Sequence, residues 1–152
     1  MDYDIVLKRL RKRPRVNGWT SPNTETKNSR IHGLGLFALS RIDVGEPVAA
    51  WGGHIVRSEE LALLPPHLAR HYALPIHPGF FLSEITEDEL DAADFINHSC
   101  DPNCTIVDEL ILVAKREVLC GEELTADFEE DNGTTIIDCA CGMPCCRGIV
   151  RL

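Results

Sequence analysis

The polar stretch at residues 94–103 constrains this chain more than any other segment. Apolar residues lead into it, and an amide, an imidazole and a thiol then follow at Asn97, His98 and Cys100. The proline after Asp101 is a turn signal, because it disfavours helix in its neighbour. Asn97 and a neutral His98 each offer a donor and an acceptor, and Cys100 offers a metal ligand or a nucleophile. On these residues alone, a polar loop of an ordinary domain is the alternative.

Two further segments carry possible site residues. Residues 29–38 contain a Gly33-x-Gly35 element ahead of an apolar run, and residues 121–128 end in an Asp-Phe pair. Glycine has no Cβ, so the backbone at Gly33 and Gly35 can approach a ligand closely. A Gly-x-Gly bend without any ligand is the alternative for this pair taken alone.

Charge is distributed unevenly along the chain, whose formal net charge is −9. Residues 1–15 carry six basic side chains against two acidic ones, so the rest of the chain is more acidic still. An acidic body favours a basic protein as partner and makes nucleic acid an improbable one. The basic arm is interpreted as a solvated, partly disordered segment, with nucleic-acid contact, a localisation signal and methylation of the arm as alternatives.

No apolar run reaches the ~20 residues of a membrane span, and the N-terminus lacks an apolar segment of signal-peptide length. We therefore expect an intracellular protein without a membrane partner, cytoplasmic in a bacterium or nuclear in a eukaryote. Seven cysteines in such a chain favour metal over disulfides, and four of them fall within residues 139–146. A disulfide interpretation of this cluster is the minor alternative.

Turn signals and short apolar runs predict one mainly β domain with many short strands and small helices between them. Little regular structure is expected in residues 1–29. Strands are predicted around the 33–35 bend, at 80–82 and at 123–128, and as two hairpins that join 48–51 to 54–56 through Gly52-Gly53 and 105–107 to 110–114. Helices are predicted at 58–64, at 66–72 and after a capping box at 86–89.

In their order and spacing, the Gly-x-Gly, Asn-His-Ser-Cys-Asp-Pro-Asn and Glu-Leu-Thr-Ala-Asp-Phe segments resemble the SET-domain protein lysine methyltransferases. The resemblance runs from about Arg30 to Gly148. It implies a SET-domain (β-clip) fold of short curled sheets with a C-terminal pseudoknot, which would bring residues 97–98 beside residues 127–128. It divides the chain into a basic N-terminal arm at 1–29, a SET domain at 30–131 and a post-SET zinc-binding segment at 132–152.

The resemblance also implies the activity, which is transfer of a methyl group from S-adenosylmethionine to the ε-amine of lysine in a protein such as a histone or histone-like protein. Asn97 and His98 would contact the methyl donor, although local backbone capping and an ordinary buried histidine are the alternatives for the pair. The donor-binding candidates are Gly33, Leu34, Gly35, Phe81, Asn97 and His98.

Phe128 departs from the family pattern, in which a tyrosine hydroxyl at this position orients the amine beside the transferring methyl group. Losing one preorganised polar group can cost on the order of 10²–10³ in rate. Ala126, two residues earlier on the strand, leaves room for more than one methyl group, unless packing explains its size. A weakened module that binds the donor or a basic peptide without efficient transfer is the alternative. The predicted catalytic set is Asn97, His98, Ala126 and Phe128.

Three cysteines in a Cys-x-Cys-x4-Cys pattern, followed by Arg147, resemble the post-SET segment. Together with Cys100 they supply four thiolates, enough for a closed tetrahedral Zn2+ site that would pin the tail against the active-site loop. Cys145 is an extra thiol that can compete with its neighbour, whereas Cys104 and Cys120 are expected to be buried apolar residues. The predicted zinc ligands are Cys100, Cys139, Cys141 and Cys146.

Overall fold

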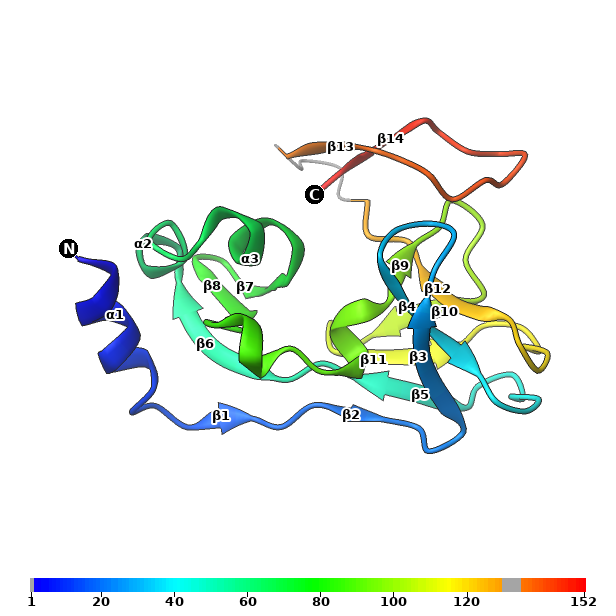
Figure 1. The fold of residues 1–152 in the computed structure, drawn as a ribbon, viewed down its shortest axis with the longest axis horizontal. Helices are drawn as coiled ribbons and strands as arrows, with labels where there is room; N and C mark the ends of the chain where they lie inside the picture. The colour runs from blue at the N-terminus through cyan, green and yellow to red at the C-terminus, as the bar shows by residue number, and fades with distance from the viewer. Residues whose placement is uncertain (1, 130–134) are drawn as a thin grey trace.

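The computed structural model describes residues 2–129 and 135–152, which form small twisted sheets with most helices gathered at one end (Figure 1). The predicted mainly β fold with few short helices is confirmed. In this described part no helix is long and apolar enough to span a membrane. The helices are α1 (Tyr3–Leu10), α2 (Ser58–Leu61), α3 (Pro66–His71) and the 3-10 helices η1 (Glu87–Glu89) and η2 (Ala92–Phe95). The strands are β1 (Arg15–Val16), β2 (Trp19–Thr20), β3 (Thr24–Asn28), β4 (Leu34–Ala38), β5 (Pro47–Ala50), β6 (Gly53–Arg57), β7 (Ala73–His77), β8 (Phe80–Ser83), β9 (Asn97–His98), β10 (Cys104–Val107), β11 (Ile111–Ala114), β12 (Glu123–Ala126), β13 (Ile136–Asp138) and β14 (Ile149–Arg151).

The sheet that contains β12 positions the site. The strand orders are β1-β6-β8-β7, β10-β11-β5-β2, β3-β4-β12-β9 and β13-β14. β12 pairs antiparallel with β4 and parallel with β9, with Ala126 opposite His98. The N–H of Phe128, just beyond β12, donates to His98 Nδ1. Residues 97–98 and 127–128 therefore lie side by side, as the sequence analysis expects.

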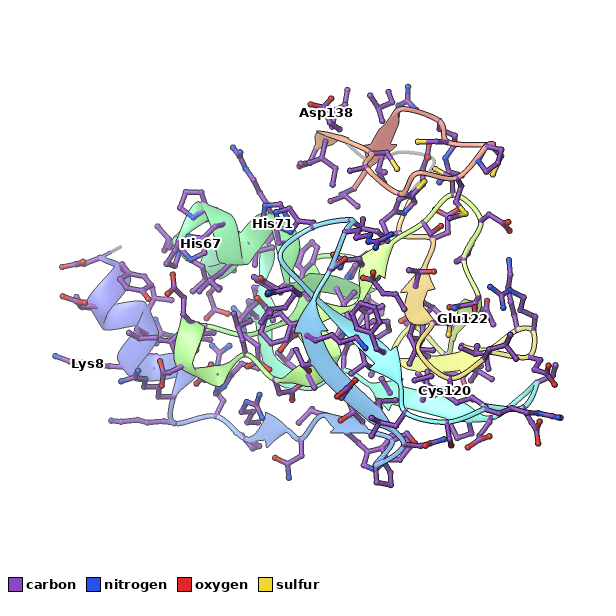
Figure 2. All side chains as sticks on the ribbon, turned by 45° about the vertical axis from the view of Figure 1, so that its right-hand side comes forward. Lys8, His67, His71, Cys120, Glu122 and Asp138 are labelled. Atoms are coloured by element: carbon purple, nitrogen blue, oxygen red, sulfur yellow. The ribbon has the colours of Figure 1, made fainter. Side chains whose placement is uncertain are left out.

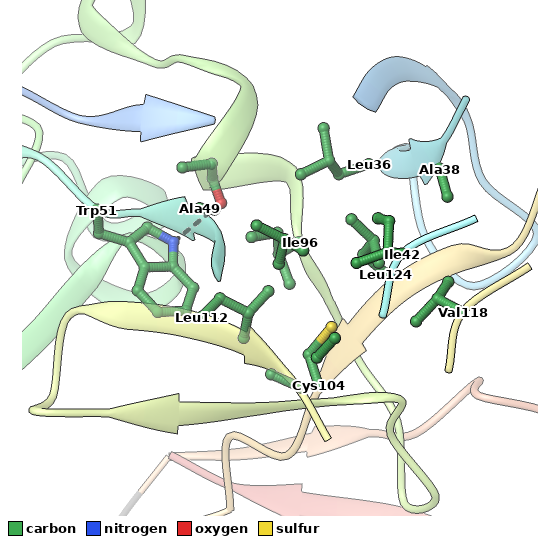
Figure 3. Close-up of a cluster of buried hydrophobic side chains, with 14 of the residues drawn as sticks. Leu36, Ala38, Ile42, Ala49, Trp51, Ile96, Cys104, Leu112, Val118 and Leu124 are labelled. Atoms are coloured by element: carbon green, nitrogen blue, oxygen red, sulfur yellow. Dashed lines mark hydrogen bonds between the residues drawn. The ribbon is translucent and has the colours of Figure 1, made fainter. Parts of the chain in front are cut away.

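The main core fills the space between the sheets (Figure 3). Leu112 of β11 lies opposite Ala49 of β5 and both are fully buried, whereas Ile111 next to it is exposed. Such alternation is what a half-buried strand requires. Trp51 Nε1 donates to the carbonyl oxygen of Ala93 at 2.9 Å, so the one polar atom of this buried indole is paired.

The expectation of little regular structure in residues 1–29 is wrong. Val6 and Leu10 stand four residues apart on one face of α1, both are buried, and they pack in a second core beside the main one. Asp2 caps the helix by accepting the N–H of Asp4 at 3.4 Å. β1, β2 and β3 then add to strands of the first three sheets. β1 and β2 have only two residues each and leave almost no periodic signal, and β3 is polar along its whole length, so the sequence does not reveal these strands.

The Gly52-Gly53 pair does not form the predicted hairpin. β5 and β6, on either side of the pair, belong to different sheets. The chain crosses residues 16–18 here, and a Cβ on Gly52 would lie 2.6 Å from the carbonyl oxygen of Val16. A close backbone crossing, rather than a tight turn, therefore requires this glycine.

Several element boundaries also differ from the prediction. α2 ends at Leu61, residues 34–38 form one strand instead of two pieces around the bend, and Thr86 makes no side-chain cap for η1. β7 is missing from the predicted set because Pro75 interrupts its apolar pattern. The strand at 80–82, the helix at 66–72 and the hairpin of β10 with β11 are confirmed.

Two arginines of the basic arm bind carboxylates inside the domain. Arg13 binds both oxygens of Glu60, at 2.9 and 2.6 Å, and Arg15 binds both oxygens of Glu84. Glu84 is 1% exposed, and burial raises the pKa of its carboxyl to about 7 although Arg15 acts in the opposite direction. These two arginines therefore dock the arm by charge.

Replacing Arg15 with alanine should destabilise the fold, because it leaves Glu84 buried without its partner. We expect Arg15→Ala to lower the free energy of unfolding by about 3–5 kcal/mol at about pH 8, measured by urea denaturation. Arg41→Ala is the control, since it removes only exposed ion pairs with Asp43 and Glu117 and should destabilise the fold far less.

The destabilisation caused by Arg15→Ala should become smaller as the pH falls. The pKa of Glu84 is raised to about 7 in the folded protein from an ordinary value of 4.5, so the folded state binds more protons between these two values. Stability linked to Glu84 therefore falls as the pH rises through this window. Arg15→Ala should raise the pKa of Glu84 further, so the variant should recover part of its lost stability below about pH 7. A destabilisation that does not change with pH would contradict this role of Glu84.

Candidate active site

A cavity of about 660 Å³ is lined by the glycine bend, by β9, by residues of α3 and β7, and by the C-terminal hairpin. Figure 2 labels His71 of α3 and Asp138 of β13, two residues that line the cavity from distant segments of the chain. Because its walls come from segments far apart in the sequence, the cavity exists only in the folded chain. Seven of the predicted site residues line it, namely Gly33, Leu34, Phe81, Asn97, His98, Phe128 and the predicted zinc ligand Cys139.

Asn97 ties β9 to the glycine bend. Its Nδ2 lies within hydrogen-bond distance of the carbonyl oxygens of His32 (3.1 Å) and Leu34 (2.9 Å) and of Glu123 Oε1 (2.8 Å). These partners lie on distant segments, so the amide is not a cap for local backbone. It fixes how the bend faces the cavity.

His98 has a defined tautomer. The backbone N–H of Phe128 donates to Nδ1 at 3.1 Å, so the neutral ring carries its hydrogen on Nε2. Nε2 lies 3.4 Å from Cys100 Sγ and 3.4 Å from a guanidinium nitrogen of Arg147. Burial lowers the pKa of His98, although Asp127 at 3.5 Å acts in the opposite direction. The ring is therefore a neutral, oriented wall of the cavity at pH 7.

The two glycines of the bend stand in different environments. Gly33 has a φ of 46°, and nothing lies within 4 Å of the place where its Cβ would stand. A Cβ on Gly35 would lie 2.8 Å from Glu123 Cδ and closer still to Oε1. Among the described donor-site candidates, Gly35 is the one that does not line the cavity. Gly33 thus provides backbone shape, whereas Gly35 makes room for a carboxylate.

Phe128 forms an aromatic wall with Trp51. The two rings meet edge to face, with centroids 6.0 Å apart and an interplanar angle of 65°. Ala126, at the end of β12, is fully buried in the core on which Phe128 packs, and it lies outside the cavity lining found in the described part of the chain. Its small side chain therefore adds no bulk to the wall.

Four cysteine sulfurs converge beside His98, from Cys100, Cys139, Cys141 and Cys146. All four lie within 4.8 Å of one another, and those of Cys100 and Cys139 are 3.6 Å apart. Tetrahedral zinc with Zn–S bonds of ~2.3 Å needs sulfurs about 3.8 Å apart, so the spacing fits this ion. Burial raises the pKa of Cys139 to about 12, which keeps this thiol protonated unless a cation compensates its charge.

The sulfurs of the other three cysteines do not belong to this group of four. Cys145 is exposed, with its Sγ 3.8 Å from the carbonyl oxygen of Cys100. Cys104 is buried as expected. The expected burial of Cys120 is wrong, because its thiol is exposed and contacts the carbonyl oxygen of Leu39 at 3.0 Å.

Comparison with known proteins identifies the family through the same segments. The family model of the SET domain matches residues 33–129. The chain belongs to the SET-domain family. Similar proteins are the H3 lysine-4 specific histone-lysine N-methyltransferase of Schizosaccharomyces pombe, 34% identical over 137 residues, histone-lysine N-methyltransferase TRX1 of Oryza sativa, 34% identical over 141 residues, and histone-lysine N-methyltransferase trithorax of Drosophila virilis, 35% identical over 133 residues. These matches cover 81%, 81% and 78% of this chain but only 14%, 13% and 3% of the three relatives.

Arg147 connects the cysteine group of this SET domain to the end of β12. Its guanidinium donates to both oxygens of Asp127, at 3.0 and 2.7 Å, and its Nε lies 2.7 Å from Glu129 Oε2. Its backbone N–H lies 3.4 Å from Cys100 Sγ. The sequence analysis missed this role. A basic residue beside the cysteines was the available signal, but sequence alone does not reveal which carboxylates it meets.

Tyr72 is a second residue whose place the sequence analysis missed. It lines the cavity together with Phe128. Burial raises the pKa of its hydroxyl, and Asp94 and Glu87 add to the shift, so the group remains a hydrogen-bond donor at neutral pH. The chain's other tyrosine, Tyr3, points its hydroxyl at the carbonyl oxygen of Ile85, 3.4 Å away.

We expect Arg147→Ala to loosen the C-terminal hairpin, because it removes two charge-assisted contacts between the tail and residues 127–129. Backbone amides of residues 135–152 should exchange with deuterium at least about tenfold faster, while those of β4 should not change. Arg151→Ala removes one 3.3 Å contact with Glu129 and is the matched control, with a smaller expected effect. Unchanged exchange in Arg147→Ala would show that the tail does not depend on this residue.

Proposed function

We propose that this SET domain transfers a methyl group from S-adenosylmethionine to the ε-amine of lysine in a basic protein, such as a histone or histone-like protein. The main support is the single cavity that joins the glycine bend, Asn97, His98 and Phe128. The relatives are named histone-lysine N-methyltransferases, and a net charge of −9 favours a basic partner. The chain spans a small part of those relatives, so both activity and substrate belong to the proposal.

The proposal includes the division of the chain and its location. Residues 30–131 form the SET domain and residues 132–152 the post-SET segment, with their boundary inside residues 130–134, which lie outside the described residues. The protein acts inside the cell, in the nucleus of a eukaryote or the cytoplasm of a bacterium. Inside the cell, thiols persist as metal ligands.

The residues at the bend fit the methyl donor. The cavity volume of about 660 Å³ lies within the usual range for small-molecule sites. Gly33 leaves open space beside the backbone, and Asn97 holds the carbonyl groups of the bend in place. S-adenosylmethionine supplies the activated methyl group when it is bound. Leu34, Phe81 and His98 complete the donor wall and exclude water from the reacting centre.

The aromatic wall prepares the lysine. A free lysine titrates near ~10.4, yet only the neutral amine is a nucleophile. Trp51 and Phe128 present apolar surface, which disfavours the ammonium form and lowers the pKa of a lysine that enters. Because Ala126 adds no bulk, we expect the product to carry more than one methyl group.

Tyr72 is the candidate to supply the hydroxyl that Phe128 lacks. Both side chains line the same cavity, and the phenol of Tyr72 stays protonated at neutral pH. A hydroxyl in this place can accept a hydrogen bond from the amine and so orient it. The second candidate function is a module that binds the donor or a basic peptide without transfer, and Phe128 is the observation that favours it.

We expect the purified protein to hold one Zn2+ per chain, measured by elemental mass spectrometry. Cys139→Ser should release the metal and weaken folding of the tail, because a closed tetrahedral site needs all four thiolates. Cys145→Ser is the matched control and should retain the metal. Equal zinc loss in both variants would mean that Cys145 shares the ligand role, and a metal-free wild type would end the zinc assignment.

Methyl transfer is tested with labelled donor on histones and on a mixed lysate, followed by mass spectrometry of modified lysines. We expect transfer by the wild type and a kcat lower by about 10²-fold in Tyr72→Phe, because one oriented polar group is lost. Calorimetry should show that this variant still binds S-adenosylmethionine. Tyr3→Phe is the matched control and should leave kcat unchanged.

Two outcomes would decide against this function. If the wild type binds the donor but transfers nothing, and transfer begins only in Phe128→Tyr, the binding module is correct. If the wild type does not bind the donor at all, the cavity serves another ligand.

A further inference from the structure

Glu123 lies at the junction of the two motifs that line the cavity. It is the first residue of β12, the strand between β4 and β9. Its Oε1 accepts hydrogen bonds from Asn97 Nδ2 at 2.8 Å and from Ser29 Oγ at 2.8 Å, while Oε2 lies 2.9 Å from the same hydroxyl. One carboxylate therefore holds a side chain of β9 and a side chain that precedes the bend.

Ser29 connects the carboxylate of Glu123 to the backbone of the bend. Its Oγ accepts the N–H of Ile31 at 2.9 Å, and its own N–H donates to the carbonyl oxygen of Gly33 at 2.8 Å. The five-residue loop is thus closed at both ends. Its shape depends on a hydroxyl whose hydrogen points at Glu123.

Gly35 supports the same arrangement from the other side. A Cβ at this position would collide with the carboxylate of Glu123 and would stand 3.1 Å from Phe37 Cε2. The second glycine of the Gly-x-Gly element therefore admits Glu123. This explains why Gly35 does not line the cavity although Gly33 does.

Ordinary ion pairing does not explain Glu123. Among the salt bridges of the described residues, none includes it, whereas its neighbour Glu122 pairs with Arg116 at 2.9 Å. A half-buried carboxylate that is held only by neutral donors needs well-placed hydrogen bonds to offset its desolvation. The hydrogen bonds of its carboxylate lead to Asn97, which lines the cavity, and to Ser29, which closes the bend.

We propose that Glu123 is a positioning residue that sets the orientation of Asn97 and the shape of the bend at residues 29–33, and thereby prepares the methyl-donor site. The inference rests on the proposed function for the identity of the ligand. Glu123 does not touch the ligand. It acts through Asn97 and Ser29, so its loss should raise KM for the donor more than it lowers kcat.

The test compares Glu123→Ala with Glu123→Gln. Glutamine has the same shape, and its Oε1 can accept both hydrogen bonds, so it should bind S-adenosylmethionine within about threefold of the wild type by calorimetry. Alanine removes the acceptors, and we expect binding at least about tenfold weaker. Glu122→Ala is the matched control, since that residue binds Arg116 and the N–H of Leu119 and should leave donor affinity unchanged.

Hydrogen exchange tests the inference without any ligand. In the free protein the amide of Ile31 should exchange faster in Glu123→Ala than in Glu123→Gln, because Ser29 loses its anchor. A second test uses the variant Gly35→Ala. It should weaken donor binding in the wild type, but should have a smaller further effect when Glu123 is already alanine, since the carboxylate is gone and, of these close approaches, only the 3.1 Å one to Phe37 Cε2 remains.

The outcomes separate this inference from the proposed function. Normal donor affinity and normal exchange in Glu123→Ala would overturn the positioning role while leaving the function intact. An equal loss in the alanine and glutamine variants would also overturn it, because charge and not placement would then matter. A wild type without donor affinity would refute the proposed function, whereas exchange at Ile31 would still decide the role of Glu123.

Discussion

The hydrogen bonds around β12 hold the site of this SET domain together. A buried strand presents N–H and C=O groups on both edges, and each of them needs a partner. β4 pairs with one edge and the two residues of β9 with the other. Where β9 ends, the buried side chain of Asn103 accepts the N–H of Thr125 at 2.9 Å and donates to the carbonyl oxygen of Glu123 at 2.8 Å. A slip of β12 by one residue would exchange its two faces and separate Phe128 from His98.

The C-terminal hairpin has little hydrophobic core of its own. Cys141 and Val150 are the buried hydrophobic residues in the described range 135–152. Burying so little apolar surface leaves the chain entropy of about 18 residues largely uncompensated. The contacts of Arg147 supply part of what apolar packing does not, and the zinc ion proposed for the four converging sulfurs would supply more. Since Ile137 and Leu152 line the cavity, the completeness of the cavity is linked to the docking of this hairpin.

The sequence predicted features in which the residue type restricts the chemistry, such as the cysteine group. It did not predict features that depend only on packing between distant segments. Four cysteines with a known spacing have few uses, and the structure brings these four sulfurs together. The expectation that residues 97–98 lie beside residues 127–128 came from the family resemblance, and the parallel pairing of β9 with β12 was not predicted, since a two-residue strand carries no readable period. The basic arm was misread because its composition suggests disorder. The residues on which Val6 and Leu10 of α1 pack, and the carboxylate partners of Arg13 and Arg15, lie far along the chain. Partners at such separations leave no local trace.

The glycines also show that a sequence does not reveal which distant residues will be neighbours. A missing Cβ is visible in the sequence, but the object that occupies its place is not. At Gly33 the place is open and the backbone is left-handed, at Gly35 it is filled by a carboxylate, and at Gly52 it is filled by another stretch of backbone. A sequence-based argument assigns all three to turns or ligands, because those are the commonest reasons for glycine. Only the fold distinguishes Gly33, which shapes the site, from Gly35, which makes room for the carboxylate that supports the site.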